Sequence, residues 1–157
     1  MNRPKGYFWD TNILTFFGHN PDHKLIQQHI ESVSWDKIFL PSVVVGEAWR
    51  GRLRKVDAVP KAIPEQAIFS HEQLAETHEI LRRFNVISFD MDAANHLSAL
   101  QQKAKRQKKS IKKRHADMMI AAMTSSNHFI VVTRNEKDFI DWLLPGQVEN
   151  WIDNPPA

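Results

Sequence analysis

The chain has 157 residues, of which 42% are hydrophobic, and this length suits one compact domain with a buried core. We therefore expect a single domain over residues 1–157. The absence of cysteine excludes a disulfide framework and a thiolate metal site. The apolar run Tyr7–Trp9 is too short for a signal peptide or a membrane span, so we expect a cytoplasmic protein without a membrane anchor.

Positive charge is concentrated in one segment. Eight of the 21 lysine and arginine residues lie between Lys103 and Arg114, with no acidic residue among them. Subtracting these eight charges from the net charge of +3 leaves −5 on the rest of the chain. This pattern is typical of a local contact with a polyanion, although a solvated helix face or a loop explains an isolated basic run equally well.

Short apolar runs predict buried strands. The first is Tyr7–Trp9, and similar runs cover Lys37–Leu40, Val86–Phe89 and Phe129–Thr133. A further strand, at one edge of the sheet, is expected to contain Trp151. Each run is too short for a helix and suits a strand that is covered on both faces.

Two segments between these runs carry apolar residues at helical spacing, namely residues 25–33 and 74–84. Ser70 and Gln73 are expected to form a capping box that opens the second helix. Two prolines interrupt residues 56–69, which we interpret as a surface connection, and two more mark a frayed C-terminal end.

Three more helices are expected farther along the chain. One begins at Ser42, one is capped by Asp92 and runs into the basic segment, and one covers Asp117–Met123. Strands that alternate with helices require crossover connections. The predicted fold class is therefore α/β, with a mostly parallel sheet covered on both faces.

Four acidic residues follow predicted strands or begin the next helix: Asp10, Glu47, Asp117 and Asp138. Because the carboxyl ends of parallel strands meet at one edge of the sheet, we expect these acids to converge there. Several carboxylates cannot all ionise in one pocket without a cation, and Mg²⁺ or Mn²⁺ prefers oxygen ligands. Such an ion supports attack of water on a phosphodiester, so phosphodiester hydrolysis is the predicted reaction.

Each acid also has a structural interpretation when it is taken alone. Asp10 could cap a helix, Asp117 could balance Arg114, and Glu47 and Asp138 could be surface charges. The order of the four acids along the chain favours the shared site.

Four segments resemble the motifs of the PIN-domain family, in the family's order and over about residues 7–151. They are Asp10–Leu14, Pro41–Gly51, Asp117–Ala122 and Thr133–Phe139. The resemblance implies a three-layer α/β/α sandwich with a short, mostly parallel sheet. It also implies cleavage of RNA that depends on Mg²⁺ or Mn²⁺. Within the family, the chain resembles the VapC type of toxin ribonuclease from type II toxin-antitoxin pairs.

The same resemblance implies roles for individual residues. Metal ligands and catalytic acids would be Asp10, Glu47, Asp117 and Asp138, and substrate-positioning residues would be Asn12, Thr133 and Asn135. The basic residues Lys108, Lys109, Lys112, Lys113 and Arg114 would hold the RNA backbone. Trp49 and Leu53 would form part of a groove for an antitoxin protein, and a homodimer is expected.

Two departures from the family pattern affect the site. The segment before Asp117 is longer and more basic than is usual in the family, which leaves open whether residues 103–114 form a helix or a loop. Position 135 is Asn, where some relatives carry an aspartate. We therefore expect one tightly held ion, with a second arriving together with RNA.

Other functions stay open beside this one. The chain could be a PIN nuclease of RNA processing that is no toxin, or a catalytically silent domain that binds RNA or protein. A covalent aspartyl phosphate is disfavoured because Asn12 stands where a second aspartate is needed. Zinc is disfavoured because no His-Glu-x-x-His pattern occurs. The sequence does not identify the RNA that is cleaved.

Overall fold

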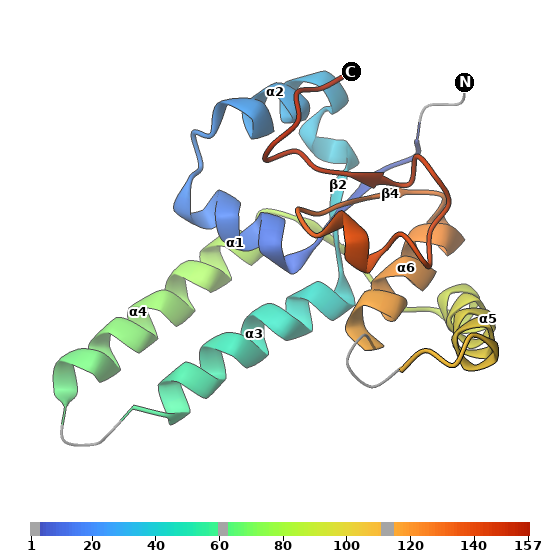
Figure 1. Ribbon diagram of the computed structural model, residues 1–157. Helices are drawn as coiled ribbons and strands as arrows, with labels where there is room; N and C mark the ends of the chain where they lie inside the picture. Colours follow the sequence, from blue (N-terminus) through green and yellow to red (C-terminus); the bar gives the residue numbers. More distant parts are fainter. Residues whose placement is uncertain (1–3, 60–62, 111–114) are drawn as a thin grey trace.

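The computed structural model describes residues 4–59, 63–110 and 115–157, and a five-stranded sheet lies at its centre (Figure 1). The strand order is β3-β2-β1-β4-β5, and every neighbouring pair is parallel. The α/β fold class with a parallel sheet is confirmed. The strands are β1 (Tyr7–Trp9), β2 (Ile38–Pro41), β3 (Asn85–Ile87), β4 (Ile130–Val132) and β5 (Val148–Glu149).

The helices that connect successive strands flank this sheet. Two short 3-10 helices, η1 (Trp35–Lys37) and η2 (Glu136–Asp138), precede β2 and follow β4. The α-helices are α1 (Thr11–His19), α2 (Lys24–Val33), α3 (Ser42–Asp57), α4 (Pro64–Leu81), α5 (Met91–Arg106) and α6 (His115–Asn127).

Side chains of β1 alternate between the two faces of the sheet, and both faces are covered. Trp9 is fully buried on one face, where its ring meets Phe17 of α1 at 5.1 Å and Phe84 at 5.3 Å. Phe8 packs in a second cluster with Ala93 of α5 and Met123 of α6. The predicted three layers are therefore present.

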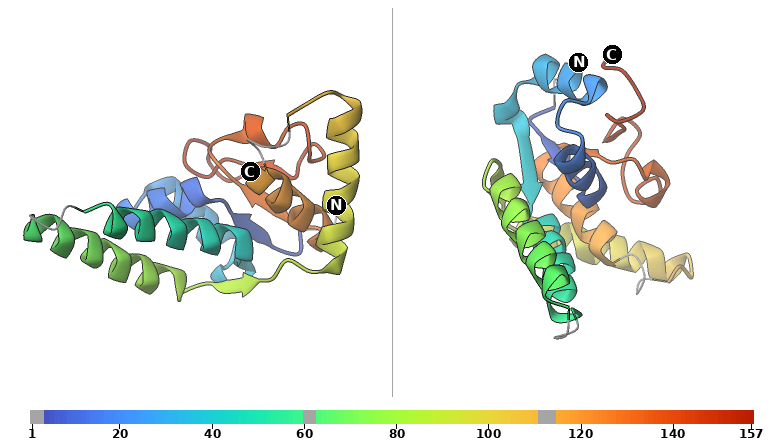
Figure 2. Two further views of the ribbon diagram at one scale, coloured as in Figure 1. Left: turned by 90° about the horizontal axis from the view of Figure 1, so that it is seen from below. Right: turned by 90° about the vertical axis from the view of Figure 1, so that its left-hand side faces the viewer.

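Helices α3 and α4 lie side by side and extend well beyond the sheet (Figures 1 and 2). The Nε of Arg52 donates to Thr77 Oγ1 at 2.8 Å between them. The connection predicted over residues 56–69 is shorter than expected, because α3 continues to Asp57 and α4 begins at Pro64. A proline at the first helical position loses no intrahelical hydrogen bond, so Pro64 begins this helix and does not interrupt it.

Three more predictions need correction. Ser70 and Gln73 do not open a helix, because both lie inside α4. The backbone N–H of Ala93 donates to Asp90 Oδ1 at 2.9 Å, so Asp90 and not Asp92 caps α5. The edge strand ends at Glu149, and Trp151 lies beyond it in a buried turn. Helix α1 was not predicted. In the part of the chain that the structure describes, no helix combines the length and the apolar character needed to cross a membrane.

Candidate active site

Asp10 lies at the carboxyl end of β1 and is also the N-cap of α1. Its backbone N–H donates to Val132 O at 3.0 Å, which continues the pairing of β1 with β4. Its side chain is only 7% exposed, and Oδ1 accepts a hydrogen bond from the Thr11 backbone N–H at 2.8 Å. The capping interpretation of Asp10 is therefore confirmed, and its position at the end of the first strand is as predicted.

The second carboxylate oxygen of Asp10 is held by two side chains. Oδ2 accepts from Asn12 Nδ2 at 3.0 Å and from Thr133 Oγ1 at 2.9 Å. Asn12 Nδ2 also lies 3.0 Å from Thr133 Oγ1, which accepts from the Asn135 backbone N–H at 3.0 Å. Asn12 and Thr133 thus orient Asp10, while Asn135 acts on it only through Thr133.

Burial raises the pKa of the Asp10 carboxyl, because desolvation penalises its charged form. Hydrogen bonds from Thr11 and Thr133 oppose this shift, whereas the negative charges of Glu47 and Asp138 add to it. The pKa is raised overall. Asp10 is therefore a buried acid whose negative charge the surrounding protein compensates only in part.

Two further acids line the same pocket as Asp10. Glu47 lies in the second turn of α3 and is half-buried, and its Oε2 accepts a hydrogen bond from Thr11 Oγ1 at 2.5 Å. Asp117 lies in the first turn of α6. Asp10, Glu47 and Asp117 come from three separate parts of the chain and line one pocket beyond the carboxyl end of β1.

Asp138 is not among the residues that line this pocket. It lies in η2 after β4, although its charge reaches Asp10. Sequence order alone could not separate Asp138 from the others. The direction of a side chain in a single 3-10 turn depends on how that turn packs.

The three pocket acids fit a hard divalent cation by their chemistry. They offer only carboxylate oxygens, which Mg²⁺ and Mn²⁺ prefer, and the buried charge of Asp10 calls for a compensating positive charge. Among residues 4–59, 63–110 and 115–157, no three acidic or histidine side chains form a ready-made metal centre. The acids supply the donors without converging fully on one point.

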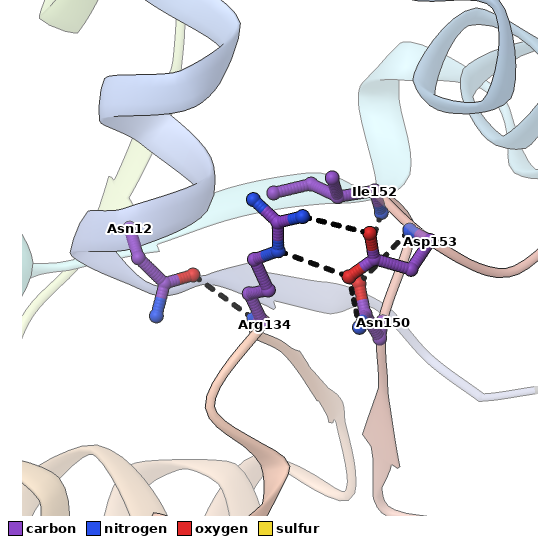
Figure 3. Close-up of polar contacts among 5 residues, drawn as sticks. All are labelled: Asn12, Arg134, Asn150, Ile152 and Asp153. Carbon is purple, nitrogen blue, oxygen red and sulfur yellow. Dashed lines mark hydrogen bonds and ion pairs between the residues drawn. The ribbon is translucent and has the colours of Figure 1, made fainter.

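Arg134 also lines this pocket. Figure 3 shows its contacts with Asn12 and Asp153. Its backbone N–H donates to Asn12 Oδ1 at 3.0 Å, and its guanidinium binds Asp153 through Nε at 3.0 Å and Nη2 at 2.9 Å. Sequence reasoning missed both Arg134 and Asp153. The spacing of Asn150 and Asp153 is the one signal that could have indicated an ordered turn at this end of the chain.

A second hollow adjoins the acid pocket at Glu47, which lines both. Arg50 and His115 supply its cationic or titratable side chains, and Phe89 and Met119 supply apolar ones. The carboxylate of Glu47 accepts a hydrogen bond from Thr11, which lines the acid pocket. Glu47 therefore lies at the border between the acid pocket and this second hollow.

The basic segment is described only in part. Lys108 is exposed, whereas Lys109 has an intramolecular partner, since its Nζ lies 2.8 Å from Asp141 Oδ2. This ion pair ties the end of α5 to the residues that follow η2. The expected RNA contacts of Lys112, Lys113 and Arg114 lie outside the described residues.

Trp49 and Leu53 lie one turn apart on α3. Trp49 is half-buried, and its ring is 5.8 Å from that of His78 on α4. It lines a shallow hollow with Gly18 and residues of α4, and this hollow does not include the acids. Leu53 is 47% exposed. Trp49 therefore lines a different hollow from the three pocket acids.

Solved structures with the same fold come from several bacteria. A chain of the DNA-bound VapBC from Salmonella typhimurium gives a TM-score of 0.71 at 23% identity, covering 93% of this chain and 98% of that one. VapBC-1 from nontypeable Haemophilus influenzae gives 0.70 at 19% identity, with 92% and 97% covered. A toxin-antitoxin complex from Klebsiella pneumoniae gives 0.60 at 21% identity, with 93% and 98% covered.

No curated protein sequence matches the chain. The likeness to solved structures establishes a shared fold at these identities. The family model of the PIN domain matches residues 7–141, which include all four predicted acids. The chain belongs to the PIN-domain family.

Proposed function

We propose that this protein is a metal-dependent endoribonuclease that hydrolyses RNA phosphodiester bonds. Membership of the PIN-domain family supports a nuclease. The observation that carries the proposal is the common pocket of Asp10, Glu47 and Asp117, which come from three separate elements. A catalytically silent binding domain would have no need to bury the carboxyl of Asp10, because burial penalises its charged form and raises its pKa.

Asp10, Glu47 and Asp117 would hold the divalent cation, Mg²⁺ or Mn²⁺, with Asp138 as a nearby fourth acid. When bound there, the ion would lower the pKa of a water molecule and stabilise charge on the leaving oxygen. Asn12 and Thr133 orient the Asp10 carboxylate, and Thr11 orients that of Glu47. Asn135 supports this arrangement through its bond to Thr133.

RNA would lie over the acid pocket and the second hollow, which share Glu47. Arg50 and His115 lie where a phosphate next to the scissile one could reach them, and Phe89 offers a ring against which a base could stack. Outside the hollows, Lys108 and Lys109 with Lys112, Lys113 and Arg114 would attract the RNA backbone. The Lys109 side chain would have to leave Asp141 to do so.

We further propose that the protein is the toxin of a type II toxin-antitoxin pair, of the VapC kind. The support is the shared fold with chains of two VapBC complexes and a toxin-antitoxin complex, each covered over nearly its whole length. The antitoxin would contact Trp49 and Leu53, since Leu53 is an exposed apolar residue beside the half-buried Trp49. A homodimer and a cytoplasmic location stay predictions.

The decisive experiment is a cleavage assay on total RNA with the purified chain. We expect cuts with Mg²⁺ or Mn²⁺ and none after chelation with EDTA. Asp10→Asn should abolish cleavage, whereas the matched control Asp92→Asn, at an exposed residue of α5, should keep it. Equal cleavage by both variants, or cleavage in EDTA, would rule out the proposed chemistry.

The toxin assignment needs its own experiment. Induced expression of the wild-type chain should arrest bacterial growth, and Asp10→Asn should not. A short neighbouring reading frame that encodes a DNA-binding protein should relieve the arrest when it is expressed together with the toxin. Active ribonuclease without growth arrest would favour a PIN nuclease of RNA processing.

A further inference from the structure

The loop after β4 is tied to the C-terminal turn by a bidentate ion pair. Both guanidinium nitrogens of Arg134 that face Asp153 lie within 3.0 Å of its carboxylate oxygens (Figure 3). Arg134 and Asp153 are about half exposed, with side-chain exposures of 51% and 44%. Exposed pairs usually contribute little, but bidentate geometry with both partners held in place makes this pair stronger than most.

The Asp153 end of the pair is held by its own turn. Asn150 Oδ1 accepts from the backbone N–H groups of Ile152 at 3.1 Å and Asp153 at 3.2 Å. Asn150 Nδ2 donates to Asp153 Oδ2 at 2.9 Å. Trp151 is fully buried between these residues, and Ile152 is 4% exposed. The Asp153 carboxylate is thus fixed to the core of the protein.

The Arg134 end reaches the candidate active site through its backbone. The Arg134 N–H donates to Asn12 Oδ1 at 3.0 Å, so this oxygen must face the loop. The amide nitrogen of Asn12 must then face Asp10 Oδ2 and Thr133 Oγ1. A flipped Asn12 would place an oxygen against a carboxylate, which is repulsive. The Arg134 backbone N–H therefore stabilises the same orientation of Asn12 that Asp10 and Thr133 require.

We propose that Asp153 is a positioning residue for the candidate active site, acting on Asp10 through Arg134 and Asn12. This inference rests on the proposed ribonuclease function. Asp153 restrains the Arg134 side chain, and that restraint holds the Arg134 backbone N–H against Asn12. The C-terminal turn, where the sequence predicted an edge strand around Trp151, thereby becomes part of the catalytic architecture.

Arg134 could instead bind RNA directly, and the two roles predict different effects of removing Asp153. If its guanidinium leaves Asp153 to bind an RNA phosphate, then removing Asp153 frees a cation and strengthens RNA binding. If Asp153 instead positions the site, its removal lowers kcat and leaves KM for RNA unchanged. The split between kcat and KM therefore separates the two roles.

The experiment compares Asp153→Ala with wild type and with a matched control. Glu79→Ala removes another exposed ion pair, in which Glu79 Oε1 of α4 lies 3.3 Å from Arg82 Nη1. Both residues are far from Asp10 in the chain. Hydrogen exchange of the Arg134 amide is measured together with kcat and KM. We expect Asp153→Ala to speed this exchange and to lower kcat, each by about tenfold, with KM unchanged. Glu79→Ala should change none of the three.

Asp153→Glu keeps the carboxylate and should restore most of the rate and of the amide protection. If the alanine variant unfolds, Asp153→Asn takes its place because it alters the turn least. It should also speed exchange of the Arg134 amide and lower kcat, each by less than the alanine variant. Unchanged Arg134 exchange in both Asp153→Ala and Asp153→Asn, or a lowered KM, would overturn the proposal. The exchange measurement needs no RNA, so failure of the ribonuclease function would be seen separately in the wild type.

Discussion

The hydroxyl of Thr11 donates a hydrogen bond of 2.5 Å to the carboxylate of Glu47. The backbone N–H of the same residue donates to Asp10 at 2.8 Å. Thr11, the first residue of α1, thus contacts the acid that directly follows β1 and the acid in α3, and it fixes their relative position.

Replacing Thr11 by Val removes the hydroxyl and keeps the shape of the side chain. We expect kcat for RNA cleavage to fall by about tenfold, because a hydrogen bond to a charged group contributes about 1.5–3 kcal/mol. Thr11→Ser keeps the hydroxyl and should retain most of the activity. Equal rates for the valine and serine variants would show that the bond to Glu47 has no role in catalysis.

The raised pKa of Asp10 predicts how stability changes with pH. A carboxyl whose pKa is raised above its ordinary 3.8 favours folding below that pH, and this contribution is lost as the pH rises through the folded-state value. Asp10→Asn carries no such titration. In metal-free buffer, the wild type should therefore lose stability relative to Asp10→Asn as the pH rises above 3.8.

Urea unfolding at several pH values measures this difference. The lowered pKa of Asp153, caused by its bonds to Asn150 and Arg134, acts in the opposite direction but is present in both proteins and cancels. A difference in unfolding free energy between wild type and Asp10→Asn that does not vary with pH would contradict the burial of an ionised Asp10.

The basic segment should set the salt dependence of RNA binding. Changing Lys108, Lys112 and Lys113 together to Gln should lower RNA affinity and reduce the slope of log K against log salt by about 2, at roughly 0.7 per phosphate contact. Lys24→Gln, at an exposed lysine of α2, serves as a control and should have little effect. Filter binding to the Asp10→Asn protein measures the slope without cleavage.

Lys109 should behave differently from its neighbours. Its ion pair with Asp141 means that Lys109→Gln also loosens the end of α5. We expect a change in the salt slope smaller than that caused by Lys108→Gln. If all these slopes equal that of the wild type, the basic segment is a solvated surface.

The antitoxin contact predicted for α3 can be separated from folding. Leu53 is exposed, so Leu53→Ala should change the unfolding free energy by less than about 0.5 kcal/mol. Its affinity for the antitoxin, measured by calorimetry, should nevertheless fall by about tenfold, and Trp49→Ala should weaken binding at least as much. Met91→Ala, at an exposed apolar residue of α5, is the control. Full affinity in both α3 variants would place the antitoxin elsewhere.

Strands β1, β2 and β4 could be predicted because each is a short apolar run that is mostly buried in the parallel sheet, and their ends differ by at most one residue. The run predicted for β3 was also found, although that strand is mostly exposed, whereas β5 ends before Trp151. Helix α1 could not be predicted. Its sequence from Thr11 to Phe17 is rich in β-branched and aromatic residues, which favour helices little. It forms because Asp10 caps it and because Ile13, Leu14 and Phe17 are buried.

The placement of the acids shows the same limit. The rule that ligands gather beyond the carboxyl ends of parallel strands predicted that Asp10, Glu47 and Asp117 meet, and all three line one pocket. Asp138 follows the same rule in sequence but does not line that pocket. Asp153 was missed because its role depends on a contact with Arg134 that no local pattern encodes.

The most direct test of this account is a crystal grown with excess Mn²⁺ and measured for anomalous scattering. We predict one strong anomalous peak within coordinating distance of carboxylate oxygens from Asp10, Glu47 and Asp117, and a weak peak or none in Asp10→Asn. Three carboxylates that point apart in the presence of excess Mn²⁺, with no peak among them, would contradict the proposed chemistry.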